Sequence, residues 1–312
     1  MSVVRKAVIT AAGRGTRQFP ATVTVQKEFI PLVDRDLVTK PTVQIVVEEA
    51  VASGIEEVCI VTSPEGLCQF RRHFGPVSAA DRAAFKGKAW ALAETDHLED
   101  LSDRISYALQ ETPEGFGHAV YCARDFVGDE PFLQMLGDHI YLPRGEVRCA
   151  RQLLDAYQQA QCTVTGVQQT PTEELHLFGT VAGHRRPGLT PLYDVTAIVE
   201  KPTPEYAAEY LVTEGLPAGT YLCHFGMHVL TPGIFARLQE RIERNLREGG
   251  EIQLTSAQAD LVTHEPYTAL EVAGLRLDMG VPLGLLETQF ALALASPARE
   301  GLLARLKPFL VP

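Results

Sequence analysis

Short apolar runs alternate with amphipathic stretches over the first 140 residues of the chain. Short apolar runs predict buried strands, and apolar positions that recur every three to four residues predict helices that pack on one face. We therefore expect strands at 6–10, 57–62, 105–109 and 131–136, and helices at 41–53 and 117–127. This alternation predicts βαβ units in a mostly parallel sheet, with ligands bound beyond the carboxyl ends of its strands.

A polar, helix-prone stretch at 63–104 interrupts this pattern and predicts a solvated surface insertion. Strands are expected again at 162–167, 179–181, 194–199 and 220–227, with helices at 232–247 and 255–263. The tail from 282 to 309 is expected to be helical. It contains more Leu, Ala and Phe than one exposed helix requires, so it should pack on the domain or on another subunit.

The charge and composition exclude several classes of protein. The formal net charge is -11 without a long basic run, so a nucleic-acid partner is not expected. The apolar runs are too short to span a bilayer, and the first residues lack the apolar core of a signal peptide. Six scattered cysteines form no Cys-x-x-Cys pair. These features predict a cytoplasmic protein without membrane association and with buried or idle thiols.

A glycine-rich turn, AAGRGTR at 11–17, follows the first expected strand. Small residues let the backbone approach a phosphate chain, and consecutive N–H groups can bind it. The turn lacks the third glycine of the dinucleotide fingerprint and the Gly-Lys-Ser/Thr ending of a P-loop, which disfavours a dehydrogenase or a P-loop ATPase. Taken alone, the motif is equally compatible with a tight turn between a strand and a helix.

Several motifs together resemble the sugar-phosphate nucleotidyltransferase family. AGRGTR at 12–17 and KEFIPL at 27–32 are similar to the family signature, and FPAT at 19–22 is similar to its bacterial UTP–glucose-1-phosphate uridylyltransferase branch. The same order continues with GFGHAV at 115–120, GD at 137–138, VEKP at 199–202, GEIQLT at 250–255 and DMG at 278–280. The resemblance covers about residues 4–295.

The resemblance implies an architecture and a reaction. The fold would be a Rossmann-like α/β fold of the nucleotide-diphospho-sugar transferase type, with a mixed, mostly parallel sheet flanked by helices. Residues 1–280 would form the catalytic domain, and 281–312 a helical segment and candidate interface of a homo-oligomer, a dimer or tetramer. The implied reaction transfers a uridylyl group from UTP to glucose 1-phosphate and releases pyrophosphate.

The resemblance also implies which residues bind the nucleotide and the metal. Arg17 and Lys27 would hold the triphosphate, with Arg17 toward the leaving pyrophosphate. Asp138 and Asp278 would bind Mg²⁺, since hard oxygen donors suit a cation that also binds substrate phosphates; the alternative for each is a capping or surface role. Backbone groups and one glutamine amide would contact the nucleotide at Ala11, Ala12, Gly13, Gly15, Thr16, Gln110 and Gly115.

The sugar end of the implied site is formed by the EKP motif. Glu200 would accept hydrogen bonds from sugar hydroxyls, and Lys201 would neutralise the attacking phosphate as a catalytic residue. The backbone of Gly179 would meet the sugar. Without the resemblance, an exposed Glu-Lys pair is the ordinary interpretation of these two residues.

Some positions depart from the family pattern and leave the specificity open. Val23 and Glu114 replace lysines, Gln168 or Gln169 replaces a glutamate, and 34–40 contains extra residues that are expected to reshape the rim of the site. The alternatives are therefore another NDP-sugar pyrophosphorylase, such as a glucose-1-phosphate thymidylyltransferase, and a non-catalytic homologue that binds nucleotide sugars.

Overall fold

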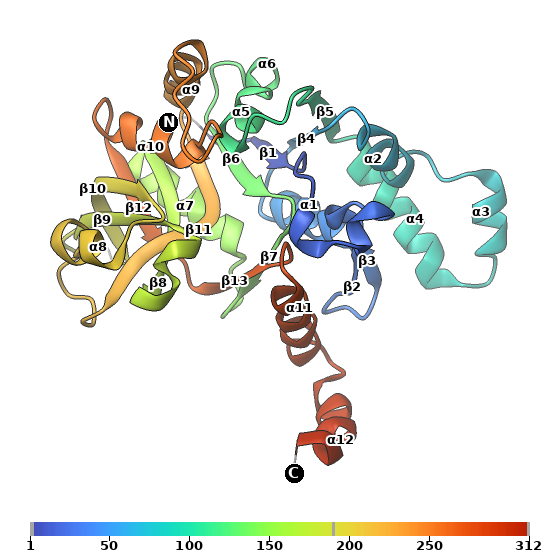
Figure 1. The fold of residues 1–312 in the computed structure, drawn as a ribbon. Helices are drawn as coiled ribbons and strands as arrows, with labels where there is room; N and C mark the ends of the chain where they lie inside the picture. The colour runs from blue at the N-terminus through green and yellow to red at the C-terminus, as the bar shows by residue number, and fades with distance from the viewer. Residues whose placement is uncertain (1–2, 189–190, 311–312) are drawn as a thin grey trace.

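A nine-stranded mixed sheet lies at the centre of the computed structural model, which describes residues 3–188 and 191–310 (Figure 1). The strand order is β5-β4-β1-β6-β11-β8-β12-β10-β9. One half is parallel and consists of β1 (Lys6–Thr10), β4 (Glu57–Thr62), β5 (Ile105–Leu109) and β6 (Phe132–Leu136). The other half consists of β8 (Thr163–Pro171), β9 (Gly179–Arg185), β10 (Leu192–Glu200), β11 (Thr220–Leu230) and β12 (Tyr267–Glu271).

The expected predominance of parallel pairing holds only for the first half of the sheet. In the second half β8 and β12 are parallel, whereas the pairs of β11 with β6, β8 and β9 and of β10 with β9 and β12 are antiparallel. The connection between β9 and β10 is too short for the crossover that parallel neighbours need. The sheet is mixed, as predicted, with its parallel part at the glycine-rich turn.

Helices cover both faces of the sheet. The alternation along β1 assigns Ala7 and Ile9 to one apolar core and Val8 to the other, as expected for a strand buried on both faces. The first core contains residues of α1 (Thr42–Ala52) and α7 (Cys149–Ala160). The second contains residues of α5 (Phe116–Tyr121), α6 (Arg124–Val127), α9 (Gly233–Glu243) and α10 (Leu254–Val262).

Two predicted helices are interrupted in the structure. The helix expected at 117–127 is divided into α5 and α6 at Cys122 and Ala123. The tail forms α11 (Pro282–Leu294) and α12 (Arg299–Leu310), which project from the body of the molecule (Figure 1). Pro297 lies in the break, where it has no N–H for a helical hydrogen bond.

Two small sheets were not predicted from the sequence. The first pairs β2 (Pro31–Val33) with β3 (Thr39–Pro41), and the second pairs β7 (His139–Pro143) with β13 (Gly274–Asp278). The 63–104 region forms α2 (Leu67–His73), α3 (Ala79–Ala84) and α4 (Ala89–Ser102), with α3 and α4 at one extremity of the ribbon (Figure 1). The remaining α-helix is α8 (Pro204–Tyr210). Within the described residues, no helix is both long and apolar enough to cross a membrane.

Candidate active site

A cleft of about 740 Å³ opens at the carboxyl ends of β1 and β6. Its lining includes the glycine-rich turn after β1, residues 200–201 after β10, and residues 251–253, which pack against Gly115. The predicted site residues that line it are Ala12, Gly13, Gly15, Thr16, Arg17, Lys27, Gln110, Gly115, Asp138, Glu200 and Lys201. Ala11, Asp278 and Gly179 do not line the cleft, but each directly adjoins a residue that does. Tertiary structure thus brings the predicted residues to one place.

Close packing favours glycine at two positions of the turn, most strongly at Gly15. Gly15 has φ 64°, and a Cβ there would lie 2.9 Å from the Thr22 methyl carbon. A Cβ at Gly13 would lie 3.1 Å from the Lys27 Nζ. The Gln26 amide also donates to the Ala11 carbonyl oxygen at 2.8 Å. The turn is therefore anchored from outside the cleft, with the Lys27 ammonium directly against its backbone.

Lys27 and Asp138 form a buried ion pair at the floor of the cleft, with Nζ 2.5 Å from Oδ2. The other carboxylate oxygen of Asp138 lies 3.0 Å from His139 Nδ1. Burial opposes the charge on Asp138, but Lys27 and the hydrogen bond from His139 outweigh it and hold the pKa of this carboxyl well below its usual range. Asp138 is therefore an anion at any working pH.

Asp278 ends β13 and lies beside Asp138. Possible ligand atoms of Asp138, His139 and Asp278 all lie within 4.8 Å of one another. Gly280 adjoins this cluster, because a Cβ there would lie 2.8 Å from Asp278 Oδ1 and 3.0 Å from Asp138 Oδ2. Arg17 Nη1 is 3.7 Å from Asp278 Oδ2. Two carboxylates that converge on the edge of an open cleft suit a hard divalent cation, so these residues fit a magnesium ion.

The sugar end of the predicted site has an unusual backbone. Lys201 has φ 44°, a left-handed conformation that costs free energy in a residue other than glycine. Its N–H donates to the Phe178 carbonyl oxygen at 3.2 Å, and its Nζ is 3.5 Å from the Glu200 carboxylate. Glu200 pairs with Gly179 across β9 and β10. This conformation places an exposed ammonium directly beside a half-buried carboxylate.

The opposite end of the cleft contains Gln110, which follows β5. Its side-chain amide nitrogen donates to the Gly115 carbonyl oxygen at 3.0 Å and lies 3.2 Å from His118 Nδ1. Gly115 has φ 113°, and a Cβ there would lie 2.7 Å from the Glu251 side chain and 2.8 Å from the Ile252 carbonyl oxygen. Since the amide nitrogen is occupied, the amide oxygen of Gln110 is the atom available to a ligand.

The residues that depart from the family pattern have identifiable contacts. Glu114 pairs with Arg247 at 3.1 Å, and Gln169 donates to Glu271 at 2.8 Å. Val23 is exposed. The extra residues at 34–40 form the turn and second strand of the β2–β3 hairpin and do not line the cleft, so the expectation that they reshape its rim is wrong. Instead, Lys40 Nζ is buried among the carboxylates of Asp34, Asp36 and Glu48, at 3.4, 2.6 and 2.9 Å.

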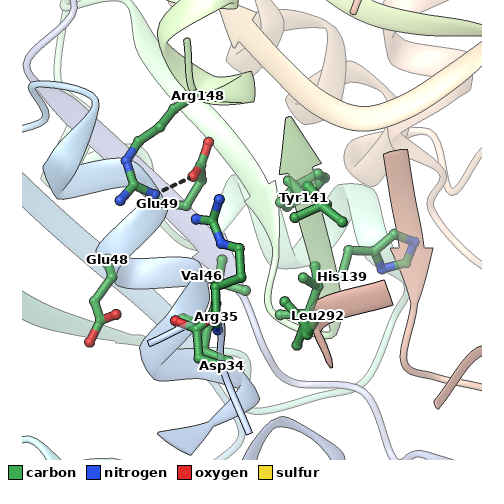
Figure 2. Close-up of a pocket in the computed structure, with 12 residues that line it drawn as sticks. Asp34, Arg35, Val46, Glu48, Glu49, His139, Tyr141, Arg148 and Leu292 are labelled. Atoms are coloured by element: carbon green, nitrogen blue, oxygen red, sulfur yellow. Dashed lines mark hydrogen bonds and ion pairs between the residues drawn. The ribbon is translucent and has the colours of Figure 1, made fainter. Parts of the chain in front are cut away.

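A second, much smaller cavity adjoins the cluster of Asp138, His139 and Asp278 through His139. Its volume is about 30 Å³, and its lining includes charged residues of α1 and the β2–β3 hairpin together with His139 and Leu292. Figure 2 shows Glu49 joined to Arg148, with Asp34 and Arg35 beside them and His139, Tyr141 and Leu292 on the other side. This volume suits about one water molecule, so the cavity is not a substrate site.

Comparison with known proteins identifies the family. The family model described as nucleotidyl transferase matches residues 6–289. The chain belongs to this family. A UTP–glucose-1-phosphate uridylyltransferase of Bacillus subtilis is 39% identical over 97% of this chain and 98% of its own length. A solved UDP-glucose pyrophosphorylase from Acinetobacter baumannii has a TM-score of 0.81 at 27% identity, over 99% of this chain and all of that one. A UDP-glucose pyrophosphorylase solved with UDP-glucose has a TM-score of 0.75 at 28% identity, over 93% of this chain and 98% of that one.

This nucleotidyl transferase has cleft residues that sequence reasoning did not assign to the site. They are Thr10, Arg14, Pro113, Phe116, Ala119, Leu136, His139, Glu251, Gln253 and Gly280. Gly280 and Glu251 lie inside motifs that carried the resemblance, so their position gave a usable signal. The sequence contains no comparable signal for His139. A histidine after an acidic residue is commonplace, and the contact between His139 and Asp138 depends on the local turn.

Glu28 is a buried acid beside the Lys27–Asp138 ion pair at the floor of the cleft. Its Oε1 lies 3.7 Å from Lys27 Nζ, and its Oε2 has no hydrogen-bond partner among the described residues. Burial raises the pKa of Glu28 to about 8, against the opposing effect of Lys27 and with a further rise from Asp138. In the unfolded chain the pKa is about 4.3. Folding at neutral pH therefore requires Glu28 to take up a proton.

Glu28→Gln should consequently be increasingly stabilising as the pH rises. In the native protein the stability associated with protonated Glu28 is complete below the unfolded pKa and is lost as the pH rises toward about 8. The difference in unfolding free energy, variant minus native, should grow by roughly 1.4 kcal/mol per pH unit between about pH 5 and 7.5. Urea titrations at several pH values, with chelator present, measure it. A difference independent of pH would show that Glu28 is ionised in the folded protein.

Proposed function

We propose that this chain transfers a uridylyl group from UTP to glucose 1-phosphate, giving UDP-glucose and pyrophosphate. The observation that carries this proposal is the arrangement of charge in one cleft. Arg17, Lys27 and the Asp138–Asp278 pair gather at the glycine-rich turn, and Glu200 and Lys201 face them from the other side. The sequence similarity to uridylyltransferases extends along nearly the whole chain and supports the same reaction.

The reaction brings two polyanions together. An oxygen of the sugar phosphate attacks the α-phosphorus of UTP, and the bond to pyrophosphate breaks in line. No general base is needed, because a phosphate monoester is already anionic at neutral pH. The protein therefore contributes mainly position and charge. The exposed guanidinium of Arg17 would bind the leaving pyrophosphate, Lys27 the triphosphate near the glycine-rich turn, and Lys201 the attacking phosphate.

Asp138 and Asp278 would hold a magnesium ion between the turn and the substrates. When bound, this ion would neutralise charge on the transferring phosphoryl group. Lys27 and His139 fix one carboxylate, since each bonds a different oxygen of Asp138. The Gly280 N–H fixes the other by donating to Asp278 Oδ1 at 2.6 Å. Both carboxylates are therefore oriented before any substrate arrives.

The orientation of the Gln110 amide favours a pyrimidine base that has a proton on N3. Its amide nitrogen is bonded to Gly115, so its oxygen would accept from the N3–H of uracil or thymine. Cytosine has no proton at N3 and would leave this buried acceptor unpaired. The contact does not separate uracil from thymine, and a thymidylyltransferase is therefore the second candidate. Whole-chain similarity to uridylyltransferases favours uracil.

The decisive experiment is a matrix of nucleoside triphosphates against sugar 1-phosphates, with magnesium and pyrophosphate release as the readout. UTP with glucose 1-phosphate should give the highest kcat/KM. Higher kcat/KM with dTTP would replace the uridylyl assignment by a thymidylyl one. If no pair released pyrophosphate above background while UDP-glucose still bound, the non-catalytic homologue would be the correct interpretation.

We also propose that the chain forms a homo-oligomer through α11. Leu283, Leu286, Phe290 and Leu294 are exposed along this helix at spacings of three and four residues. Thr288 and Leu292, on the same helix, are buried against the domain. An exposed apolar stripe opposite the packed face suits a partner of the same chemistry, such as a second copy.

Leu286→Glu with Phe290→Glu should shift the oligomer toward monomer. Two charges in an apolar interface would have to be desolvated on association. Light scattering over a micromolar concentration range measures the mass, and Glu287→Gln on the same helix is the control because it leaves the stripe intact. A native protein that is monomeric throughout this range would refute the proposal.

A further inference from the structure

Arg276 on β13 is a half-buried cation that has no role in the mechanism above. Its guanidinium carbon lies 3.6 Å from the centre of the Phe178 ring, and its Nη1 donates to the His224 carbonyl oxygen. Among the described residues it forms no ion pair within 4.0 Å, although the charges of Asp278 and Glu174 are near enough to favour its charged form. Burial lowers the pKa of Arg276 to about 10, so the group remains charged at neutral pH. A half-buried charge that is held by stacking and a carbonyl oxygen, without an ion pair, requires an explanation.

The first contact of Arg276, with Phe178, connects it to Lys201, which we propose binds the attacking phosphate. Phe178 immediately precedes Gly179, and its carbonyl oxygen accepts from the Lys201 N–H at 3.2 Å. That hydrogen bond holds Lys201 in its left-handed conformation. Since such a conformation persists only when its surroundings fix it, Phe178 helps to set the backbone from which the Lys201 side chain extends.

The second contact leads to the other side of Gly179. The pairing of β11 with β8 is irregular between His224 and His228, and Arg276 binds the backbone where this irregularity begins. The ring of His224 is directed at Gly179, because a Cβ on that glycine would lie 2.9 Å from His224 Nδ1 and 3.2 Å from Glu200 Oε2. A single guanidinium thus holds the segments on both sides of Gly179.

Arg276 also belongs to the strand that carries a metal-binding carboxylate. It pairs with Tyr141, and Asp278, two residues later, pairs with His139 in the same two-stranded sheet. This sheet connects the floor of the cleft to the sugar end.

We propose that Arg276 is a positioning residue that holds Lys201, Glu200 and Gly179 in register with the metal carboxylates, and that it thereby determines the use of the sugar 1-phosphate. This inference rests on the proposed function and extends it to a residue outside the cleft. The glycine-rich turn and Gln110 are formed by the other half of the sheet, so binding of the nucleotide should depend far less on Arg276 than binding of the sugar phosphate does.

Arg276→Met and Arg276→Lys test this inference. Methionine retains much of the volume without the charge, and lysine retains the charge without the planar face. In both variants KM for glucose 1-phosphate should rise about tenfold or more, as expected when reacting groups are displaced, while KM for UTP changes little. Arg237→Met, which removes an arginine of α9 outside the cleft, is the control and should leave both KM values unchanged. Thermal melting of each variant shows whether it folds.

Chemical rescue separates positioning from general destabilisation. Guanidinium at millimolar concentration should restore sugar use in Arg276→Ala, whereas ammonium should not, because only the planar ion can stack on Phe178. Equal rises in the two KM values, or a fall in active protein with both KM values unchanged, would overturn the inference.

The test remains informative if the proposed reaction is wrong. Calorimetry with UDP and UDP-glucose measures the contribution of the sugar to binding without any turnover. Arg276→Met should weaken the binding of UDP-glucose far more than the binding of UDP. Equal weakening of both ligands would refute the role of Arg276, whereas absence of turnover in the native protein would refute only the proposed function.

Discussion

Replacing Asp278 by asparagine should reduce turnover by about two to four powers of ten while the protein remains folded. The substitution preserves the shape of the side chain but removes the charge of one of the two carboxylates that we propose bind magnesium. Asp138→Asn should cost as much activity and also some stability, because it leaves the buried Lys27 ammonium without its nearest anion. Steady-state rates across a magnesium titration, with melting temperatures measured in parallel, test both variants.

Removing magnesium from the native enzyme tests the same metal assignment without a substitution. Excess chelator should abolish activity of the native enzyme, and added magnesium should restore it. Asp194→Asn is the matched control, because Asp194 is an exposed residue on β10 that pairs with Arg186 outside the cleft. Full activity in chelator, or in either asparagine variant, would exclude a metal bound by this pair.

Gly280→Ala should reduce turnover by about tenfold or more, although it adds only one methyl group. The added Cβ would lie 2.8 Å from Arg17 Nη2, 2.8 Å from Asp278 Oδ1 and 3.0 Å from Asp138 Oδ2. Arg17 is exposed and can move, but Asp138 is held from both oxygens by Lys27 and His139. The methyl group would therefore displace Asp278 and separate the two carboxylates.

A second glycine provides the control for Gly280. Gly145 follows β7, and a Cβ there would have no atom within 4 Å, so Gly145→Ala should retain full activity. Stopped-flow rates at saturating substrates and magnesium would separate a slower chemical step from weaker binding. If Gly280→Ala had native turnover and native magnesium affinity, the carboxylates would not need the spacing seen here.

Much of the parallel half of the sheet was predictable because its signals are local. The predicted strands at 6–10, 57–62 and 105–109 coincide with β1, β4 and β5. An apolar run inside a βαβ pattern identifies a doubly covered strand without knowledge of its neighbours. The short strands β7 and β13 were missed, because five residues in an isolated pair give too weak a pattern.

The candidate site also contains residues that the sequence locates and residues that only the structure locates. The glycine-rich turn, Lys27 and the EKP motif could be located from the order of short motifs, since each lies within a few residues of a strand. Arg276 could not be located in this way, because its contacts are with the distant residues Phe178 and His224. His139 could not be located either, because its contact with Asp138 depends on the geometry of the turn between them. The extra residues at 34–40 show the same limit, since only the structure places them in a hairpin around Lys40 rather than at the cleft.

Local sequence patterns are enough to predict the α/β class and the glycine-rich turn after β1, with charged residues close by. These follow from hydrophobic periodicity and from glycine chemistry, both of which act over a few residues. Folding is what brings Asp138 and Asp278 together beside Gly280 and places Arg276 against Phe178, next to Gly179. Such proximity depends on how β7 pairs with β13 and on how β11 joins β6, and pairing between distant strands leaves no periodic signal in the chain.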